Sequence, residues 1–280
     1  MHADGGLDFS AWGRLIDFHI ENGTSGIVVA GTTGESAGLS DPELLQLTQR
    51  ACDQGRGRIQ IIAGAGTSST AATVERVRQV SQLPVDGVLI VTPAYNRPTQ
   101  EGLFRHYEAV AAASRVPVIA YNVPSRTAVD MLPATVARIA QLPRVVAVKE
   151  AVAQVARVQE ILEQVPASFA VLSGDDASAC EVVLAGARGV ISVTANVAPR
   201  AMAAMIAAAV AGDSAGARTL DARLAPLHEN LFLETNPIPA KWALARMGLI
   251  GPGLRLPLTE LAQPFRAQLE RALRQSGALQ

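Results

Sequence analysis

The chain has 280 residues, of which 49% are hydrophobic, and its formal net charge is −1. This composition can bury a large apolar core, and the balanced charge gives no electrostatic argument for binding nucleic acid or an anionic membrane. Because no run of 18 apolar residues occurs and residues 1–9 lack the apolar stretch of a secretion signal, we expect a soluble, cytoplasmic protein.

Strands and helices are predicted to alternate along most of the chain. The first helix is capped by Ser10 and ends at Asn22-Gly23. Apolar runs predict strands over 26–30, 59–63, 87–91, 116–120, 145–151, 169–172 and 189–193, and the helical periodicity of apolar residues predicts helices over 41–53, 70–81, 103–113, 132–140, 155–164 and 179–187. From about Gly212 only helices are predicted, over 220–231, 238–247 and 258–273.

This alternation predicts an α/β fold with a parallel sheet and helices outside it. Nearly every predicted strand is apolar until its C-terminal end, where Gly, Thr, Tyr, Asn, Asp or Lys follows. In a (β/α)8 TIM barrel all those ends meet on the face that holds the active site. We therefore predict a TIM-barrel catalytic domain over residues 1–212 and a C-terminal helical region over residues 213–280.

One lysine stands near the end of the most apolar of these strands. Strand alternation places Val145, Ala147 and Lys149 on one face. Burial lowers the pKa of a lysine, which then can form a Schiff base with a carbonyl substrate. Only two of the 24 basic residues are lysines, and arginine cannot do this chemistry. A lysine that extends its ammonium to solvent or joins an ion pair is the alternative interpretation of this strand.

Other polar residues follow neighbouring strands. The loop Gly31-Thr32-Thr33-Gly34 offers backbone amides and hydroxyls to a small carboxylate, although plain turns look alike. Tyr95 and Tyr121 follow two strands and could relay protons or be structural. Arg126 could bind a carboxylate through its guanidinium fork. The pair Asp175-Asp176 has no nearby histidine or third carboxylate, which favours a hydrogen-bonded loop over a metal site.

Several of these segments together resemble the dihydrodipicolinate synthase family. They are GTTGES (31–36), TPAYNRPTQEGL (92–103), YNVPSRT (121–127), VKE (148–150), SGDDAS (173–178), GVISVTAN (189–196), NPIPAKW (236–242) and LRLPL (254–258). The resemblance extends from about Asp8 to the end of the chain. It implies a lyase of the class I aldolase type that condenses pyruvate with L-aspartate 4-semialdehyde to 4-hydroxy-tetrahydrodipicolinate in lysine biosynthesis.

The resemblance also implies a role for each site residue. Lys149 would form the imine with pyruvate, and Tyr121 would move protons at that imine. Thr32 and Tyr95 would complete a proton relay. Thr33 would bind the pyruvate carboxylate, and Arg126 would bind the carboxylate of the semialdehyde. Gly174 and Ile191 would contribute backbone or apolar contacts. The imine carries the chemistry, so no cofactor and no metal is expected.

The sequence departs from the family's usual pattern in three segments, at four positions. Val152 and Ala153 stand where the family usually has Thr or Ser and then Gly, Ala128 stands where it usually has Gly, and Ala94 replaces the first of two tyrosines. None of these removes a group with an assigned role. Two other readings stay open, namely a pyruvate aldolase of the same family that acts on a sugar acid or related 2-keto acid, and a catalytically inactive relative. Arg126 favours the synthase.

The resemblance implies that Tyr95 reaches into the site of a neighbouring subunit. We therefore expect a homo-oligomer, with a dimer as the smallest active unit and a dimer of dimers as the assembly.

In relatives inhibited by lysine, the allosteric pocket draws on positions that here are Asp41, Leu44, Ser68, Ala72 and Ala94. Two alanines and a leucine cannot pair with the ammonium groups of a bound amino acid. Weak inhibition by lysine, or none, is therefore the expectation.

Only seven strands are predicted, whereas a closed barrel of this kind has eight. Family members begin with an apolar strand, but this chain begins with the loop-like segment MHADGG (1–6). Without that strand, the strands at 26–30 and 189–193 would each expose an unpaired edge. We hypothesise that the natural start lies upstream by about ten residues, an estimate from usual strand length plus a short lead-in. A rearranged terminus or a partner chain is the alternative.

Overall fold

The computed structural model describes residues 1–279 and contains a sheet of seven strands in that range. The strands are β1 (Gly26–Val29), β2 (Gln60–Gly64), β3 (Gly87–Val91), β4 (Val118–Asn122), β5 (Val145–Glu150), β6 (Ala170–Ser173) and β7 (Gly189–Val190). Their spatial order is their order in the chain, and the described pairs from β2 to β7 are parallel. This is the topology of a (β/α)8 barrel, and the prediction of that fold class is confirmed.

Twelve α-helices and two short 3₁₀ helices are described before, between and after these strands. They are α1 (Phe9–Glu21), η1 (Ser36–Gly38), α2 (Asp41–Gly55), α3 (Thr70–Val80), α4 (Gln100–Ala113), α5 (Pro124–Thr127), α6 (Pro133–Ile139), α7 (Val155–Gln164), α8 (Ala179–Leu184), η2 (Thr194–Asn196), α9 (Pro199–Val210), α10 (Ser214–Asn230), α11 (Ile238–Arg246) and α12 (Gln263–Gln275). None of the described helices is long and apolar enough to cross a membrane.

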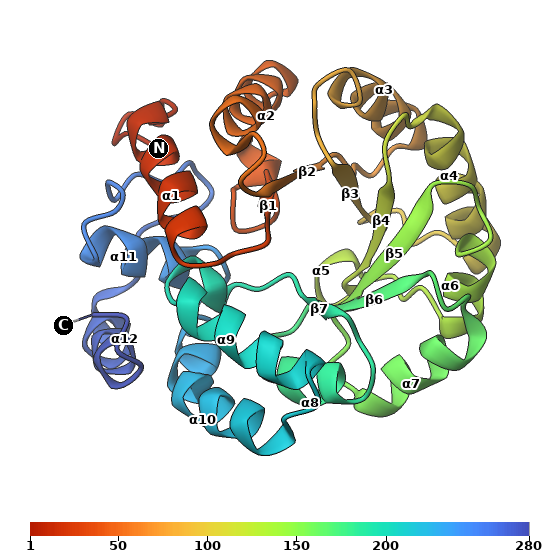
Figure 1. Ribbon diagram of the computed structural model, residues 1–280. Coiled ribbons are helices and arrows are strands. Elements are labelled where there is room, and N and C mark those ends of the chain that lie inside the picture. The colour runs from red at the N-terminus through yellow and green to blue at the C-terminus, as the bar shows by residue number, and fades with distance from the viewer. Residues whose placement is uncertain (280) are drawn as a thin grey trace. The chain divides into compact units, whose positions relative to one another are not determined.

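The chain divides into two compact units. One unit comprises residues 1–60 and 192–280, and the other comprises residues 61–191. In the second unit, α3, α4, α6 and α7 lie outside the strands β3 to β6 (Figure 1). In the first unit, α10 packs against α9 and α12. The separate prediction of a barrel domain over 1–212 and a helical region over 213–280 stays a prediction.

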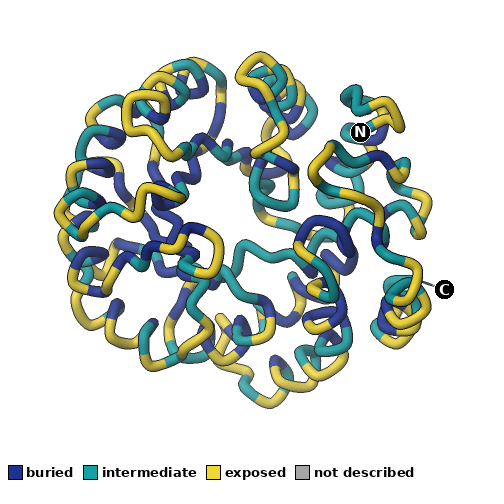
Figure 2. The backbone as a smooth tube through the Cα atoms, turned by 180° about the vertical axis from the view of Figure 1, so that it is seen from behind, coloured by how far each residue is buried: buried dark blue, intermediate teal, exposed yellow. Residues whose placement is uncertain are grey.

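The core of the second unit consists of the strands and the inward faces of their helices. Strands β3 and β4 are buried along almost their whole length, as near-continuous apolar parallel strands are when helices cover them. Tyr107 of α4 is wholly buried against β3, and its hydroxyl donates to the carbonyl oxygen of Ile90 at 2.9 Å. In Figure 2 buried and exposed segments alternate along the helices, because each turns one face to the strands and the other to solvent.

Local signals explain most helix starts, with some corrections to the prediction. Asp8, not Ser10, caps α1, because its carboxylate accepts the amide of Ala11 at 2.9 Å. Strand β4 begins at Val118, two residues later than predicted, because Pro117 has no amide hydrogen for the strand ladder. The alanine-rich helix α9 was not predicted, and β7 is two residues long rather than five.

Residues 1–8 contain no strand, and β1 is the first strand of the described chain. Residues 1–8 instead contact Arg255, which belongs to the same unit. The guanidinium of Arg255 donates to the carbonyl oxygen of Gly5 at 2.8 Å, and the amide of His2 donates to the carbonyl oxygen of Gly6 at 2.8 Å. The hypothesis of an upstream start stays a prediction.

Candidate active site

Lys149 lies next to Tyr121 on neighbouring strands. In the register of β4 and β5, Tyr121 is the partner of Lys149, and the next pair is Asn122 with Glu150. Residues paired in this way point to the same face of a sheet. The ammonium nitrogen of Lys149 is 4.3 Å from the centre of the Tyr121 ring, within the range of a cation–π contact. Both residues are buried, so the predicted burial of the lysine is confirmed.

The surroundings of Lys149 favour its uncharged form. Burial lowers the pKa of Lys149 to about 8, and the positive charge of Arg126 adds to the lowering, while the carboxylate of Asp176 acts in the opposite direction. At pH 7 an amine of this pKa is unprotonated roughly 200 times more often than an ordinary lysine. The amine is therefore available as a nucleophile near neutral pH.

Two further predicted residues, Gly174 and Ile191, lie at the ends of the next strands. The amide of Gly174 donates to the carbonyl oxygen of Glu150 at 2.7 Å, and the amide of Ile191 donates to the carbonyl oxygen of Ser173 at 2.9 Å. A Cβ atom at Gly174 would lie 3.0 Å from Cε of Lys149 and 2.9 Å from Cβ of Ala151. Position 174 therefore accommodates no side chain while the lysine keeps this conformation.

Arg126 is held on a short loop that follows β4. It belongs to the single-turn helix α5, which ends at Thr127 and is followed by Ala128 with a positive φ of 58°. The hydroxyl of Thr127 fastens this turn, because it donates to the carbonyl oxygens of Val123 and Val129 at 3.2 and 3.1 Å. The loop thus has a defined shape, and the charge of Arg126 acts on Lys149.

Tyr95 extends away from the unit that bears it. It is 92% exposed, and its φ is +70°, a conformation that is uncommon for a residue other than glycine. The loop around it is nonetheless fixed, since the side-chain amide of Asn96 donates to the carbonyl oxygen of Ser68 at 2.8 Å. Residues with backbone conformations of this kind cluster at active sites and ligand-binding loops.

Thr32 and Thr33 lie in the other unit, in the loop between β1 and η1. The amides of Gly34 and Ser36 both donate to the carbonyl oxygen of Gly31, so this loop folds on itself. The side-chain amide nitrogen of Asn236 donates to the hydroxyl of Thr33 at 3.0 Å. A long-range contact therefore orients the predicted carboxylate-binding hydroxyl.

The second lysine of the chain supports the same loop. Lys241 forms an ion pair with Glu35 and donates to the carbonyl oxygen of Gly253 at 3.0 Å. The other oxygen of Glu35 accepts the amide of Arg255 at 3.0 Å. Neither Glu35 nor Asn236 was assigned a role from the sequence. Each contacts a residue about 200 positions away, Lys241 and Thr33 respectively, and the sequence gives no sign of contacts over that separation.

Asp176 is a further residue that sequence reasoning did not assign to the site. It is buried, and its charge acts on Lys149, whereas its neighbour Asp175 accepts the amide and hydroxyl of Ser178 at 2.9 and 2.7 Å. The pattern of apolar strand and polar strand end could have indicated Asp176, since it follows β6 directly beside β5. Among described residues, the unit 61–191 thus gathers an amine, a phenol, a guanidinium and a carboxylate.

These groups suit imine chemistry on a small carbonyl acid. An unprotonated amine can act as a nucleophile, a phenol can carry protons, and a guanidinium can bind a carboxylate.

Known proteins match this chain over its full length. Residues 1–276 match the Dihydrodipicolinate synthetase family. A 4-hydroxy-tetrahydrodipicolinate synthase of Stutzerimonas stutzeri is 51% identical and one of Methylococcus capsulatus is 52% identical, each over 100% of this chain and 96% of the relative. The crystal structure of the chloride-inhibited dihydrodipicolinate synthase from Acinetobacter baumannii, complexed with pyruvate, is 46% identical, with a TM-score of 0.98 over 100% of this chain and 96% of that chain. The chain therefore belongs to the Dihydrodipicolinate synthetase family.

Proposed function

We propose that this chain condenses pyruvate with L-aspartate 4-semialdehyde to give 4-hydroxy-tetrahydrodipicolinate in lysine and diaminopimelate biosynthesis. The observation that carries the proposal is the buried amine of Lys149, with its pKa lowered to about 8, beside Tyr121 in a chain of this family. Relatives at about 50% identity bear the name of that synthase. We place the reaction in the cytoplasm, in line with the sequence.

Lys149 begins the reaction as a nucleophile. Its unprotonated nitrogen attacks the keto carbon of pyruvate, water leaves, and the resulting imine loses a methyl proton to become an enamine. The enamine carbon bonds to the aldehyde carbon, and the aldehyde oxygen takes up a proton to become the 4-hydroxyl group. The amino group of the semialdehyde then attacks the imine carbon, which closes the ring and releases the amine of Lys149. The imine accepts the electron pair in this sequence, so the proposal includes no cofactor. Tyr121 carries protons at the imine, a role that suits its place beside Lys149 on the same face.

The other residues bind the substrates. Thr33, oriented by Asn236, holds the pyruvate carboxylate, and Arg126 holds the carboxylate of the semialdehyde. Gly174 and Ile191 contribute backbone and apolar contacts. Thr32 and Tyr95 complete the proton relay, with Tyr95 supplied by a neighbouring subunit, because its ring is 92% exposed in the isolated chain. A dimer is then the smallest active unit, and a dimer of dimers the assembly.

Reduction with borohydride in the presence of pyruvate tests the imine. We expect a single pyruvyl adduct, located on Lys149 by peptide mass mapping. An adduct on Lys241, or none, would refute the imine mechanism on Lys149.

A substrate panel tests the identity of the aldehyde. The purified chain is assayed with pyruvate plus aspartate semialdehyde and, separately, with a set of 2-keto-3-deoxy sugar acids. Turnover of the semialdehyde supports the synthase, whereas cleavage of a sugar acid alone would show a sugar-acid aldolase instead.

Tyr95→Phe tests the proposal that Tyr95 acts in the site of a neighbouring subunit. The variant should slow turnover without changing the melting temperature, and a fully active monomer would contradict the shared site.

A further inference from the structure

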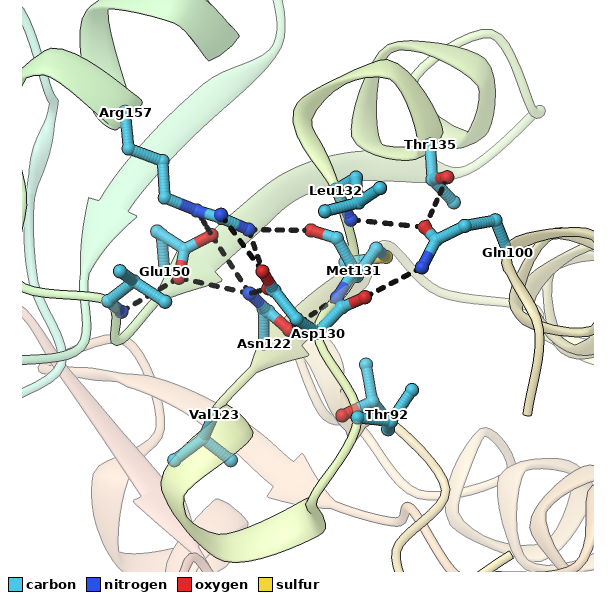
Figure 3. A network of polar contacts seen from close by, with 12 residues as sticks. Thr92, Gln100, Asn122, Val123, Asp130, Met131, Leu132, Thr135, Glu150 and Arg157 are labelled. Atoms are coloured by element: carbon cyan, nitrogen blue, oxygen red, sulfur yellow. Dashed lines mark hydrogen bonds and ion pairs between the residues drawn. The ribbon is translucent and has the colours of Figure 1, made fainter. Parts of the chain in front are cut away.

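At the ends of β4 and β5 lies a polar cluster, here called the rim network, formed by Asn122, Asp130, Glu150 and Arg157 (Figure 3). Asn122 and Glu150 are buried, whereas the side chain of Asp130 is 35% exposed. Arg157 donates from Nε to Glu150 at 3.0 Å and from its two terminal nitrogens to Asp130 at 2.7 and 3.1 Å. The side-chain amide nitrogen of Asn122 donates to the carboxylate of Asp130 at 2.8 Å and to both carboxylate oxygens of Glu150 at 3.1 Å. The four side chains thus form one connected unit.

The rim network occupies the pair of residues that directly follows the reactive pair. Tyr121 is in register with Lys149, and Asn122 is in register with Glu150. Successive side chains of a strand point to opposite faces. The network therefore joins the ends of β4 and β5 from the face opposite to Lys149, and it fixes the spacing of the two strands that carry the phenol and the amine.

The same network closes the loop that carries Arg126. This loop begins after Asn122 and ends at Asp130, and the two side chains hydrogen-bond across its base at 2.8 Å. The amide of Met131 donates to the side-chain oxygen of Asn122 at 2.9 Å, and Arg157 donates to the carbonyl oxygen of Met131 at 2.8 Å. The position of Arg126 is thereby tied to the spacing of β4 and β5.

The burial of these charges points to a geometric role. The side chain of Glu150 is 0% exposed and that of Arg157 is 12% exposed. Buried ion pairs add little to stability compared with well-packed apolar residues of similar volume, because the ions lose their hydration. A planar guanidinium that donates to several partners restricts the arrangement of the groups around it.

We propose that the rim network is a set of positioning residues that sets the placement of Arg126 and the Tyr121–Lys149 pair for the reaction. The inference rests on the proposed function of those three residues. The network touches neither substrate and acts through the strand ends and the loop base. Its loss displaces Arg126, which weakens binding of the acidic aldehyde and removes a positive charge from the neighbourhood of Lys149.

Two variants of Arg157 test this in the full-length chain. Arg157→Lys keeps the positive charge, but an ammonium group cannot contact Glu150, Asp130 and Met131 together. Arg157→Met removes the charge and all the hydrogen-bond donors of the guanidinium. We expect KM for aspartate semialdehyde to rise roughly 10-fold in Arg157→Lys and further in Arg157→Met. The pH profile of pyruvate trapping on Lys149 should shift upward in both, because Arg126 no longer lowers the pKa of the lysine to the same extent.

The matched control is Arg138→Lys in the same unit, since Arg138 donates to Glu101 at 2.7 Å on the surface and is outside the network. It should leave both readouts unchanged. Folded Arg157→Lys protein with the wild-type KM and pH profile would overturn the proposal, even if Arg157→Met fails to fold. Failure of the wild-type chain to form an adduct on Lys149 would instead refute the proposed site on which the inference rests.

Discussion

Lys149 and Lys241 are the only lysines of the chain, and they lie in different units. Lys149 is buried, and the side chain of Lys241 is 12% exposed. Lys241 forms an ion pair with the buried carboxylate of Glu35 and a hydrogen bond with a carbonyl oxygen. Lys149 instead faces the ring of Tyr121, and burial dominates its pKa. Burial alone therefore does not make a lysine reactive. The two lysines differ in their partners, which are a carboxylate for Lys241 and an aromatic ring for Lys149, the proposed nucleophile.

The largest expected effect separates the two lysines by chemistry. Lys149→Arg should lower turnover by at least about 10³-fold, because a guanidinium forms no imine with pyruvate. It should also abolish labelling by pyruvate and borohydride. Lys241→Arg, which retains a cation opposite Glu35, should still label at Lys149. Substantial turnover by the Lys149→Arg protein would mean that Lys149 is not the nucleophile.

The second prediction concerns the free energy of unfolding, which replacement by methionine should lower at Lys241 and raise at Lys149. Lys241→Met should destabilise the fold by about 3–5 kcal/mol, because the carboxylate of Glu35 stays buried without its cation. Urea unfolding of the variant measures the loss. The double variant Glu35→Gln with Lys241→Met should recover part of it. Equal stability of the single variant and the wild type would show that the ion pair is dispensable.

Lys149→Met should have the opposite effect and stabilise the fold at pH 7, by on the order of 3 kcal/mol at most. The folded-state pKa of about 8 lies below the unfolded value of 10.5, so the folded chain bears the full penalty of a buried charge below pH 8. That penalty declines as the pH rises from 8 to 10.5, where the unfolded chain binds more protons. Unfolding measured at pH 7 and pH 10.5 should therefore show the gain only at the lower pH.

The smallest expected effect is a shift of the pH profile. The rate of pyruvate trapping on Lys149 should rise with pH up to about 8 and then level off, since only the unprotonated amine reacts. Arg126→Leu should move this profile upward and Asp176→Asn should move it downward, because the two charges act on the pKa of Lys149 in opposite directions. Shifts in the reverse directions would contradict the electrostatic account.

Local patterns in the sequence predict much of the fold, and they fail where contacts are remote. The apolar strand that contains Lys149 and the helix predicted over 41–53 each depend on residues close together in the chain, so both are visible in the sequence. Helix α9 was missed because its alanines provide little contrast between an apolar and a polar face.

The same reasoning applies to the site. Lys149, Tyr121 and Arg126 could be named because strand ends and family motifs mark them. The pairing of Lys241 with Glu35 and the closure of the Arg126 loop by Arg157 depend on packing between elements. Alternation along a strand tells which face a residue occupies, but it does not tell which helix covers that face. Contacts of this kind come from the structure alone.

Gly174 has a consequence for how the reactive arm moves. A methyl group there would lie 3.0 Å from Cε of Lys149, in the space beside the last carbon of the arm. In the mechanism proposed above, the nitrogen would change from amine to carbinolamine to imine during one turnover, and each change of bonding geometry would rotate the end of the arm. A side chain at position 174 would occupy the space beside that end. A glycine beside a buried lysine thus provides freedom of motion within a close-packed core, where most side chains are held in a single rotamer.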